Sequence, residues 1–572
     1  MKTSAFQTKD LCEIARADTS ARHFAAYGRG ARLGALLLLA LFGPACGDYY
    51  RPVALPIPVN SPNPAALHFM YSVASAGSLS VGSVSQIDVT GDALTDVVNS
   101  GQSPVHAALT TDGSRAYVAN SGDDTVTVIS GAQPTTIDLA QLCPQTSPCP
   151  LVPVFAHSTE ATRMYVADKG TGTVSVINTT SNAVVATVAV NPAFAGNPVP
   201  LPNPAAQPVA LAEMPNGTKI YSINQGDSTV TSINTLDDSI AARITSFSAP
   251  PIWAVASSDN THIYVLDQSA TISVIDTLSD TVVGTAAAGA GANYIFYDRL
   301  SNRLYVTNQT ASSVSIFDIS GAALVAHAPI SISASPSSAC STAAVGAGSP
   351  IPPVVPTAIT VLGDDSRAYV ASYQLYTANG ATSVCTQADV IDNGTGLVTK
   401  TIPLYQATDN SSQTGCASAR FRVFIAASGG GANTPFKVFV SQCDAGSIAD
   451  IYTASATSGP DRHPADVLMA SLPAPVTSSS SGQISISSAS QSGSSTTYTY
   501  TPMTPTTLQV GTMVVITGMT DVGNNGVFLV SGIPAAGSFM VTNPSGVTTS
   551  AAQSGNGTSL TVGNPVFLVP GR

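Results

Sequence analysis

Charged residues are scarce in this 572-residue chain, at 9% of the total, and the 21 basic residues are outnumbered by 33 acidic ones. A phosphate backbone is attracted to basic surfaces, so this balance argues against nucleic acid as a partner. Gly, Ser, Thr, Ala and Val dominate instead, and Gly and Pro together number 85. That composition suits many short strands joined by turns.

Motifs of catalysis and metal binding are also lacking. No Gly-x-Ser-x-Gly nucleophile elbow lies between a strand and a helix. Beyond the N-terminal segment, the histidines are His68, His106, His157, His262, His327 and His463. None of them shows the close spacing of a metal motif. His106 and His157 could meet on adjacent strands, but two histidines alone are more often structural than metal-binding. We therefore expect no catalytic residue, no metal and no cofactor.

The first 45 residues have the features of a targeting segment. Arg29 and Arg32 precede the apolar run 33–42, and small residues then lead to Cys46. This order resembles a lipoprotein signal peptide, and the run is too short to span a bilayer permanently. The usual leucine three residues before Cys46 is missing, so ordinary signal cleavage is the alternative. We predict a lipidated Cys46 that anchors the protein to a membrane of the cell envelope, in the periplasm or at the cell surface.

Without residues 1–45 the chain keeps 15 basic and 30 acidic residues. The next stretch, residues 46–65, is rich in proline and fits an extended tether. Six cysteines follow, and an even number in an exported chain suits disulfides. They are Cys143, Cys149, Cys340, Cys385, Cys416 and Cys443. We predict pairs 143–149, 416–443 and 340–385, although the sequence leaves other pairings open.

One phrase recurs along the chain: a tyrosine that opens a short apolar strand, a polar hairpin and a second apolar strand. The copy at Tyr117-Val-Ala-Asn120 continues to Val126-Thr-Val-Ile129. Further close copies begin at Tyr165, Tyr221, Tyr264 and Tyr305, and looser ones at Tyr71, Tyr369 and Phe439. A third apolar run follows each pair and a fourth, often begun by proline, precedes it. Each repeat therefore predicts a four-stranded sheet.

These repeats resemble the YVTN β-propeller family, which includes surface-layer and YncE-like proteins. The resemblance implies an all-β propeller of four-stranded blades over residues 66–475. We count eight repeats, whereas members of the family usually have seven blades, so seven is the alternative. Residues 565–569 read like a strand that precedes a tyrosine, and the repeat at Tyr71 lacks one. We therefore predict that residues 561–572 close the ring beside the Tyr71 strand.

A small β module is predicted between the last repeat and the closing strand, within residues 476–560. It begins with a Ser-rich run, residues 478–495, which we interpret as a linker. Strands are predicted at residues 513–517, 526–530 and 538–542, where apolar residues cluster and Asn525-Gly526 marks a turn.

A ligand site is expected where the inner strands of the blades begin, at the mouth of the central channel. The third residue of each inner strand is histidine or aromatic in five repeats: His106, Phe155, Trp253, Tyr294 and Phe567. Ala210 and Ala358 occupy that position in two others, and Arg422 is the eighth candidate. Such rings could stack on a ligand, or they could fill the wedge-shaped gaps between blades.

The polar residues that end the tyrosine strands invite a metal or catalytic interpretation. They are Asn120, Asp168, Asn224, Asp267 and Asn308. Their recurrence in every close repeat argues for a structural role, so we predict turn formers that bond the local backbone.

Two functional classes remain. We favour a non-enzymatic binding or surface-scaffold lipoprotein whose partner is an unidentified protein, peptide or glycan. The alternative is a hydrolase of the lactonase kind, which rests on fold analogy alone. If the five ring positions form an exposed rim, Trp253→Ala should weaken binding and spare the fold. If they fill the core, the same change should cost stability.

Overall fold

The computed structural model describes residues 69–571 with internal gaps. The gaps are 78–79, 91, 131–133, 140–150, 159–161, 192–202, 336–350, 379–380, 410–414, 429–435, 456–462, 477–481, 504–507, 511, 544–545 and 550–554. The predicted signal segment, Cys46 and the tether therefore lie outside the described residues. Within the described residues, no helix is long and apolar enough to cross a membrane.

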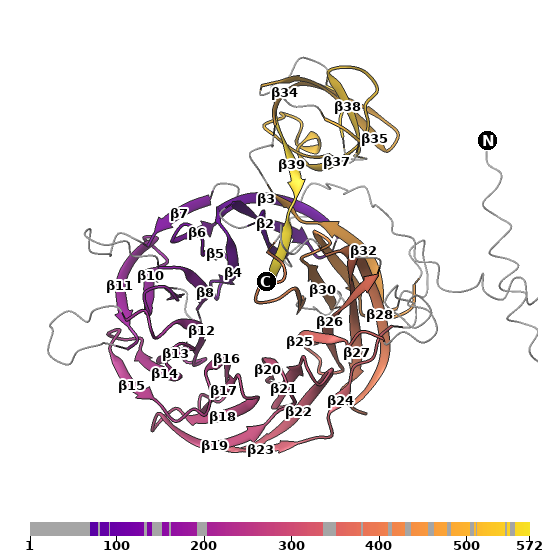
Figure 1. Ribbon diagram of the computed structural model, residues 1–572. Coiled ribbons are helices and arrows are strands. Elements are labelled where there is room, and N and C mark those ends of the chain that lie inside the picture. The colour runs from indigo at the N-terminus through magenta and orange to yellow at the C-terminus, as the bar shows by residue number, and fades with distance from the viewer. Residues whose placement is uncertain are drawn as a thin grey trace, which may run out of the picture. The chain divides into compact units, whose positions relative to one another are not determined.

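Eight antiparallel sheets are formed by the described residues before 474 together with the last strand, and they surround one centre (Figure 1). Blade 1 consists of β1 (Phe69–Ser75), β2 (Val81–Asp88), β3 (Ala93–Gln102) and β40 (Asn564–Pro570). Blade 2 consists of β4 (Pro104–Leu109), β5 (Ala116–Asn120), β6 (Thr125–Ile129) and β7 (Pro134–Asp138). Blade 3 consists of β8 (Pro153–His157), β9 (Arg163–Asp168), β10 (Thr173–Asn178) and β11 (Ala183–Ala189). Blade 4 consists of β12 (Pro208–Glu213), β13 (Lys219–Asn224), β14 (Thr229–Asn234) and β15 (Ile240–Ile244).

The second half of the ring repeats this pattern. Blade 5 consists of β16 (Pro251–Ala256), β17 (His262–Asp267), β18 (Thr271–Asp276) and β19 (Thr281–Ala287). Blade 6 consists of β20 (Ala292–Asp298), β21 (Arg303–Asn308), β22 (Ser313–Ser320) and β23 (Ala323–Ala326), with β24 (Ile330–Ser331) also paired to β22. Blade 7 consists of β25 (Val355–Val361), β26 (Arg367–Ala378), β27 (Ala381–Asp392) and β28 (Leu397–Thr408). Blade 8 consists of β29 (Val423–Ala427), β30 (Lys437–Gln442), β31 (Ser447–Tyr452) and β32 (Val467–Pro473).

Burial within a blade changes from the centre of the ring outward. In blade 3 the strands β9 and β10 are almost wholly buried, because a neighbouring blade covers each face. The outer strand β11 alternates exposed and half-buried residues, as expected of a strand with one face in solvent. The protein is therefore an eight-bladed β-propeller; the count of repeats is confirmed and the seven-bladed alternative is wrong.

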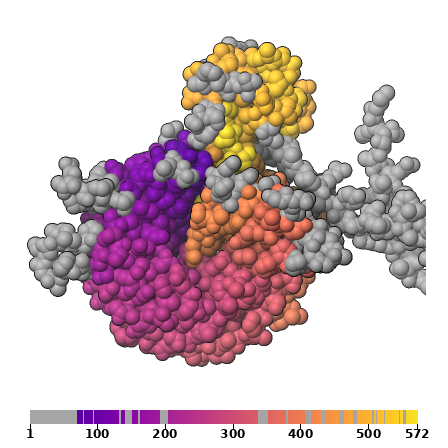
Figure 2. Space-filling view, viewed as in Figure 1, coloured from indigo at the N-terminus to yellow at the C-terminus, as the bar shows by residue number. Residues whose placement is uncertain are grey.

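The ring closes through the C-terminal strand. β40 pairs with β1 so that Tyr71 is opposite Val569 and Val73 is opposite Phe567. β40 also contacts the inner strands on either side, β29 and β4. In Figure 2 the indigo first blade accordingly lies beside the orange last blade. The predicted closure by residues 565–569 is confirmed, and it completes blade 1 with a strand from the opposite end of the chain.

Three of the repeated tyrosines, Tyr117, Tyr221 and Tyr369, tie their blade to the next one. The Tyr221 hydroxyl of blade 4 donates to Asp280 of blade 5 at 2.6 Å, and Lys219 Nζ lies 2.7 Å from the same carboxylate. Tyr117 of blade 2 likewise donates to Asn182 of blade 3 at 2.9 Å. Both acceptors have positive φ, in the tight turn between the two outermost strands, where Asp and Asn are tolerated.

A tie to the corresponding turn also closes the ring, although blade 8 has Phe439 in place of the repeated tyrosine. Lys437 and Tyr452 of blade 8 both bond the carboxylate of Asp92, which is in the corresponding turn of blade 1. The tie between the last blade and the first is therefore made by side chains as well as by β40.

Removal of one tyrosine hydroxyl tests this inter-blade tie. Tyr221→Phe should lower the free energy of unfolding by about 1–2 kcal/mol, because it deletes a hydrogen bond to a charged acceptor. Tyr264 is the matched control, since its buried hydroxyl has no hydrogen-bond partner in the described part of the chain. Tyr264→Phe should leave stability unchanged in the same urea titration. Equal losses for the two variants would contradict the assignment.

The Asn residues that end the tyrosine strands are not the predicted backbone-bonding turn formers. Asn120 Nδ2 donates to the hydroxyls of Thr125 and Thr127, at 3.0 and 2.9 Å. Asn224 and Asn308 make the same two bonds to residues five and seven positions later. These amides are buried between blades, where a side chain of the next strand is the nearest acceptor.

Two of the close repeats have aspartate in place of this asparagine, and the two aspartates accept hydrogen bonds from different kinds of donor. Asp267 accepts from the backbone N–H groups of residues 269 and 271, both at 2.9 Å, as the turn prediction requires. Asp168 instead accepts from the hydroxyls of Ser175 and Thr173, at 2.7 and 3.2 Å. Complete burial outweighs these hydrogen bonds and raises the pKa of Asp168 to about 8. Blade 3 therefore contains a carboxyl group that is protonated at neutral pH.

The C-terminal module is a small closed barrel. Its strands are β34 (Gln483–Ser492), β35 (Ser495–Pro502), β36 (Met513–Thr517), β37 (Gly526–Gly532), β38 (Ser538–Thr542) and β39 (Gly555–Val562), with β33 (Pro475–Val476) and the 3-10 turn η3 (Val522–Asn524). The strands from β34 to β39 pair in a closed cycle, because β39 bonds both β34 and β36. The barrel interior is filled by Ile484, Ile486, Tyr498, Val514, Ile516, Phe528, Phe539 and Val541.

The strands predicted in this module are confirmed, but the interpretation of the Ser-rich run as a linker is wrong for its described part. Residues 483–492 form β34, in which Ile484 and Ile486 point into the barrel and the intervening serines are more exposed. A serine on the outer face of a strand keeps its hydroxyl in solvent, so no polar group is buried without a partner. A high serine content therefore does not exclude a strand.

Candidate functional site

The inner strands bring all five predicted ring residues together at the centre of the propeller. The His106 ring lies 3.9 Å from Phe155 and 4.1 Å from Phe567, measured between ring centroids. Trp253 lies 5.2 Å from both Phe155 and Tyr294. The side chains converge because their strands share one register. In β4, for example, a register shift follows Pro104 and places His106 opposite Ala119.

Sequence reasoning missed two members of this aromatic cluster and chose one residue wrongly. In blade 8 the inner strand is β29, and Phe424 occupies the position that we assigned to Arg422. Phe424 lies 4.3 Å from Phe567, and Phe421 lies 5.5 Å from Trp253. The strand does not begin with proline and its repeat lacks the tyrosine, so the alignment there was two residues out of register.

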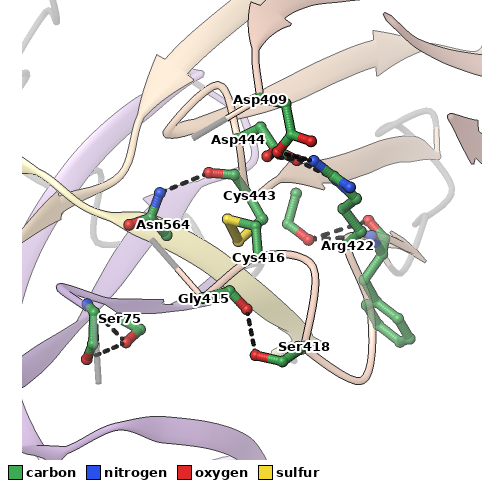
Figure 3. The surroundings of a disulfide bond; sticks show 12 residues. Ser75, Asp409, Gly415, Cys416, Ser418, Arg422, Cys443, Asp444 and Asn564 are labelled. Atoms are coloured by element: carbon green, nitrogen blue, oxygen red, sulfur yellow. Dashed lines mark hydrogen bonds and ion pairs between the residues drawn. A yellow bond between two sulfur atoms is a disulfide. The ribbon is translucent and has the colours of Figure 1, made fainter. Parts of the chain in front are cut away.

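Arg422 does not face the channel. Its guanidinium bonds Asp444 Oδ2 at 2.6 Å and Asp409 Oδ1 at 2.8 Å (Figure 3). Ala210 and Ala358, the other two residues at the third position, are fully buried small side chains.

The aromatic cluster is well packed, and the five predicted residues are only 6–8% exposed. Burial, together with the nearby His157, lowers the pKa of His106 to about 3. Its Nδ1 accepts a hydrogen bond from the Ala156 N–H at 3.3 Å. His106 is therefore a neutral core ring at physiological pH. In the described residues no group of three His, Cys, Asp or Glu side chains could hold a metal ion.

A cavity of about 330 Å³ lies against one side of this cluster, at the mouth where the inner strands begin. Its aromatic lining consists of His106, Phe155, Trp253 and Phe421. Its polar lining consists of Lys169, Gln225, Ser418 and Arg420. Tyr294 and Phe567 do not line it. The five predicted residues thus pack against one another at the centre of the ring, and three of them also contribute to the cavity wall.

The loop before β29 supplies one wall of the cavity, and it is held firmly. A disulfide joins Cys416 to Cys443, which confirms that predicted pair (Figure 3). The Ser418 hydroxyl donates to the Gly415 carbonyl at 2.9 Å, and Asn564 Nδ2 donates to the Cys443 carbonyl at 2.8 Å. Both ends of residues 416–422 are therefore fixed, one by the disulfide and the other by the Arg422 ion pairs.

The remaining cysteine predictions are tested only in part. Cys385 is disulfide-bonded. Cys143, Cys149 and Cys340 lie outside the described residues, so their pairing stays a prediction.

No family model and no curated protein matches the chain. Among solved structures, the β-propeller domain of Cps50 (Swd1) from Myceliophteria thermophila is 9% identical, with 61% of this chain and 95% of that chain covered and a TM-score of 0.39. Virginiamycin B lyase from Staphylococcus aureus is 14% identical, with 60% and 92% covered and a TM-score of 0.39. A Bacteroides fragilis protein provisionally assigned as a 6-phosphogluconolactonase is 12% identical, with 61% and 100% covered and a TM-score of 0.40. We take no activity from similarity at this level.

Proposed function

We propose that the protein is an exported, lipid-anchored β-propeller that binds a ligand at the mouth of its channel and does not convert it. The observation that carries this proposal is the cavity of about 330 Å³ between the aromatic cluster and the loop 416–422. Ligand sites are typically concave and largely apolar, with a few fixed polar groups. This cavity meets that description, and its volume is at the lower end of the usual range.

The cavity lining favours binding over hydrolysis. Among the described residues that line the cavity there is no carboxylate and no cysteine. Its one histidine, His106, is held neutral, and its Nδ1 is already an acceptor for a backbone N–H. A hydrolase of the lactonase kind would need a general base or a metal-bound water in contact with the substrate. No specific observation supports that alternative.

The partner is proposed as a small molecule, or a single ring or side chain of a glycan, peptide or protein, because a larger group exceeds the cavity. A place in the cell envelope and anchoring through Cys46 complete the proposal. The features that support them are the apolar run and the small residues before Cys46.

Tryptophan fluorescence tests binding at the mouth, since Trp253 is the only tryptophan of the chain and lines the cavity. Titration of purified mature protein with monosaccharides, amino acids and tripeptides should give a saturable change in emission for at least one class. The ligand should be recovered unchanged by mass spectrometry. Ser418→Tyr, in the exposed part of the loop, should weaken that binding, whereas Thr180→Tyr, in an exposed outer turn, should not.

Two results would count against the proposal. Recovery of a hydrolysed ligand would favour the enzyme alternative, and equal binding by the two tyrosine variants would place the site elsewhere. Export is tested separately: Cys46→Ser should abolish incorporation of labelled palmitate and release the protein from membranes, whereas continued labelling would contradict lipidation at Cys46.

A further inference from the structure

We infer that the ligand of this cavity is an anion, a carboxylate carried next to a flat ring face. The inference rests on the proposed function and names the chemistry of its ligand. It derives from the cationic side chains of the cavity, above all Arg420, and from the rings that they accompany.

Arg420 lies in the cavity wall, where its guanidinium packs against aromatic rings. Although the residue as a whole is exposed, its guanidinium carbon lies 5.4 Å from the ring centroids of both Trp253 and Phe421. One Nη donates to the Asn293 carbonyl at 2.6 Å. Cation–π contact and this single hydrogen bond fix the plane of the guanidinium, and they leave its other N–H donors unused by the described residues.

Arg420 has no acidic partner among the described residues, in contrast to two cations that are more deeply buried. Arg422 is paired with Asp409 and Asp444, and Lys437 is paired with Asp92 and Asp450. Within the described residues no carboxylate forms an ion pair with Arg420. Burial lowers the pKa of Arg420 to about 10, so it stays positively charged at neutral pH. A fixed cation that lines a cavity without a counter-ion attracts an anion, which would gain charge-assisted hydrogen bonds from it.

Lys169 adds a second positive charge to the same lining. It follows the end of β9, and no described carboxylate forms an ion pair with it either. Two cations that form no ion pair with the described residues thus share one cavity, in a chain with a net charge of −12. Such a local excess attracts an anion and repels a metal cation.

The rest of the lining specifies the shape of the ligand. A guanidinium presents parallel N–H donors that suit the two oxygens of a carboxylate. The neighbouring rings offer apolar faces for stacking, and the volume of about 330 Å³ admits about one ring with its substituent. The shared chemistry is a ring with a carboxylate beside it, which either a sugar acid or an aromatic acid can supply.

Matched pairs of probes test the charge and separate these two sources. Glucuronate is compared with glucose, and phenylacetate with phenylacetamide, in titrations of the mature protein followed by Trp253 emission and calorimetry. At least one acid should bind about 10- to 100-fold more tightly than its neutral twin, because hydrogen bonds between two charged groups are stronger than those to a neutral group. Binding of glucuronate would identify the ligand as a sugar acid, and binding of phenylacetate would identify it as an aromatic acid.

Variants connect that preference to the named residues. Arg420→Gln should remove the preference for the acid. Lys169→Gln should reduce this preference, and because Lys169 is partly exposed this variant keeps the test valid if Arg420→Gln folds poorly. Arg299→Gln is the control, since Arg299 is exposed in the β20–β21 turn and does not line the cavity. If Arg420 only packs its loop, Arg420→Gln will lower the melting temperature and leave the preference for the acid unchanged.

Equal binding of acid and neutral twin would overturn the charge assignment and leave the proposed binding at the mouth intact. Failure of all four probes to bind would also overturn the inference. The proposed function would then be decided by the broader ligand titration and the Ser418→Tyr variant.

Discussion

A chain truncated after Gly563 is expected to lose the cooperative thermal unfolding of the propeller. Truncation removes β40, the inner strand of blade 1, and leaves β1 as an unpaired edge at the centre of the ring. It also removes Phe567 and Leu568, which are 7% and 1% exposed. Deletion of one buried phenylalanine alone costs about 3–5 kcal/mol, and a whole domain is stable by only about 5–15 kcal/mol.

Circular dichroism and Trp253 emission measure this loss in two ways. Circular dichroism reports strand content. Emission reports the packing of Trp253 against Phe155 and Tyr294. As a control, residues 564–572 can be moved in front of β1 through a flexible linker, which should restore cooperative unfolding. A truncated protein that melts like the intact one would show that closure by β40 contributes little.

Asp168→Asn is expected to stabilise the protein, most strongly at pH 8 and above. Asp168 has a pKa of about 8 in the folded protein, against 3.8 for the ordinary side chain. Between these values the folded state keeps a proton that the unfolded state has released. The free energy of unfolding therefore falls as pH rises from about 4 to about 8. An asparagine has no such dependence, and the gain should reach about 2–5 kcal/mol at pH 8.

The neighbouring blade provides the reverse substitution. Asn224 occupies the same position and donates to Thr229 and Thr231. Asn224→Asp should introduce the loss of stability at high pH that Asp168→Asn removes. Urea titrations at pH 5 and pH 8.5 measure both effects. An Asp168→Asn variant whose stability changes with pH as steeply as that of the wild type would show that another group is responsible.

The architecture could be predicted because its signals are local. The strand–hairpin–strand phrase spans 12 or 13 residues in the close repeats, and alternation of apolar residues defines each strand within it. Closure by residues 565–569 could be predicted because a strand without a tyrosine and a tyrosine without a strand complement each other. The tyrosine hydroxyls, in contrast, bond residues far along the chain, such as Asp280 for Tyr221. No local pattern reports such a pair.

The site could be predicted in outline but not in composition. Alignment of the inner strands found five converging residues, yet it could not tell a rim from a core. Trp253 is 7% exposed, so Trp253→Ala should cost stability, as expected if these rings fill the core and not an exposed rim. Arg420 and Phe421 precede a strand, on a loop fixed by Cys416. They could not be found by counting strand positions, and Phe424 was missed because its strand lacks the opening proline.

A pulling force on the barrel would be transmitted directly to β40, the strand that closes the ring. β39 belongs to the barrel and β40 to blade 1, and only Gly563 separates them. Tension applied to the barrel away from the propeller would run along β40 and shear its hydrogen bonds to β1. The Gly563 N–H bonds the Ala474 carbonyl at 2.7 Å, at the entrance to the barrel, so the incoming and outgoing chains share that tension first. A partner held by the barrel would thus pull on the one strand that completes the ring.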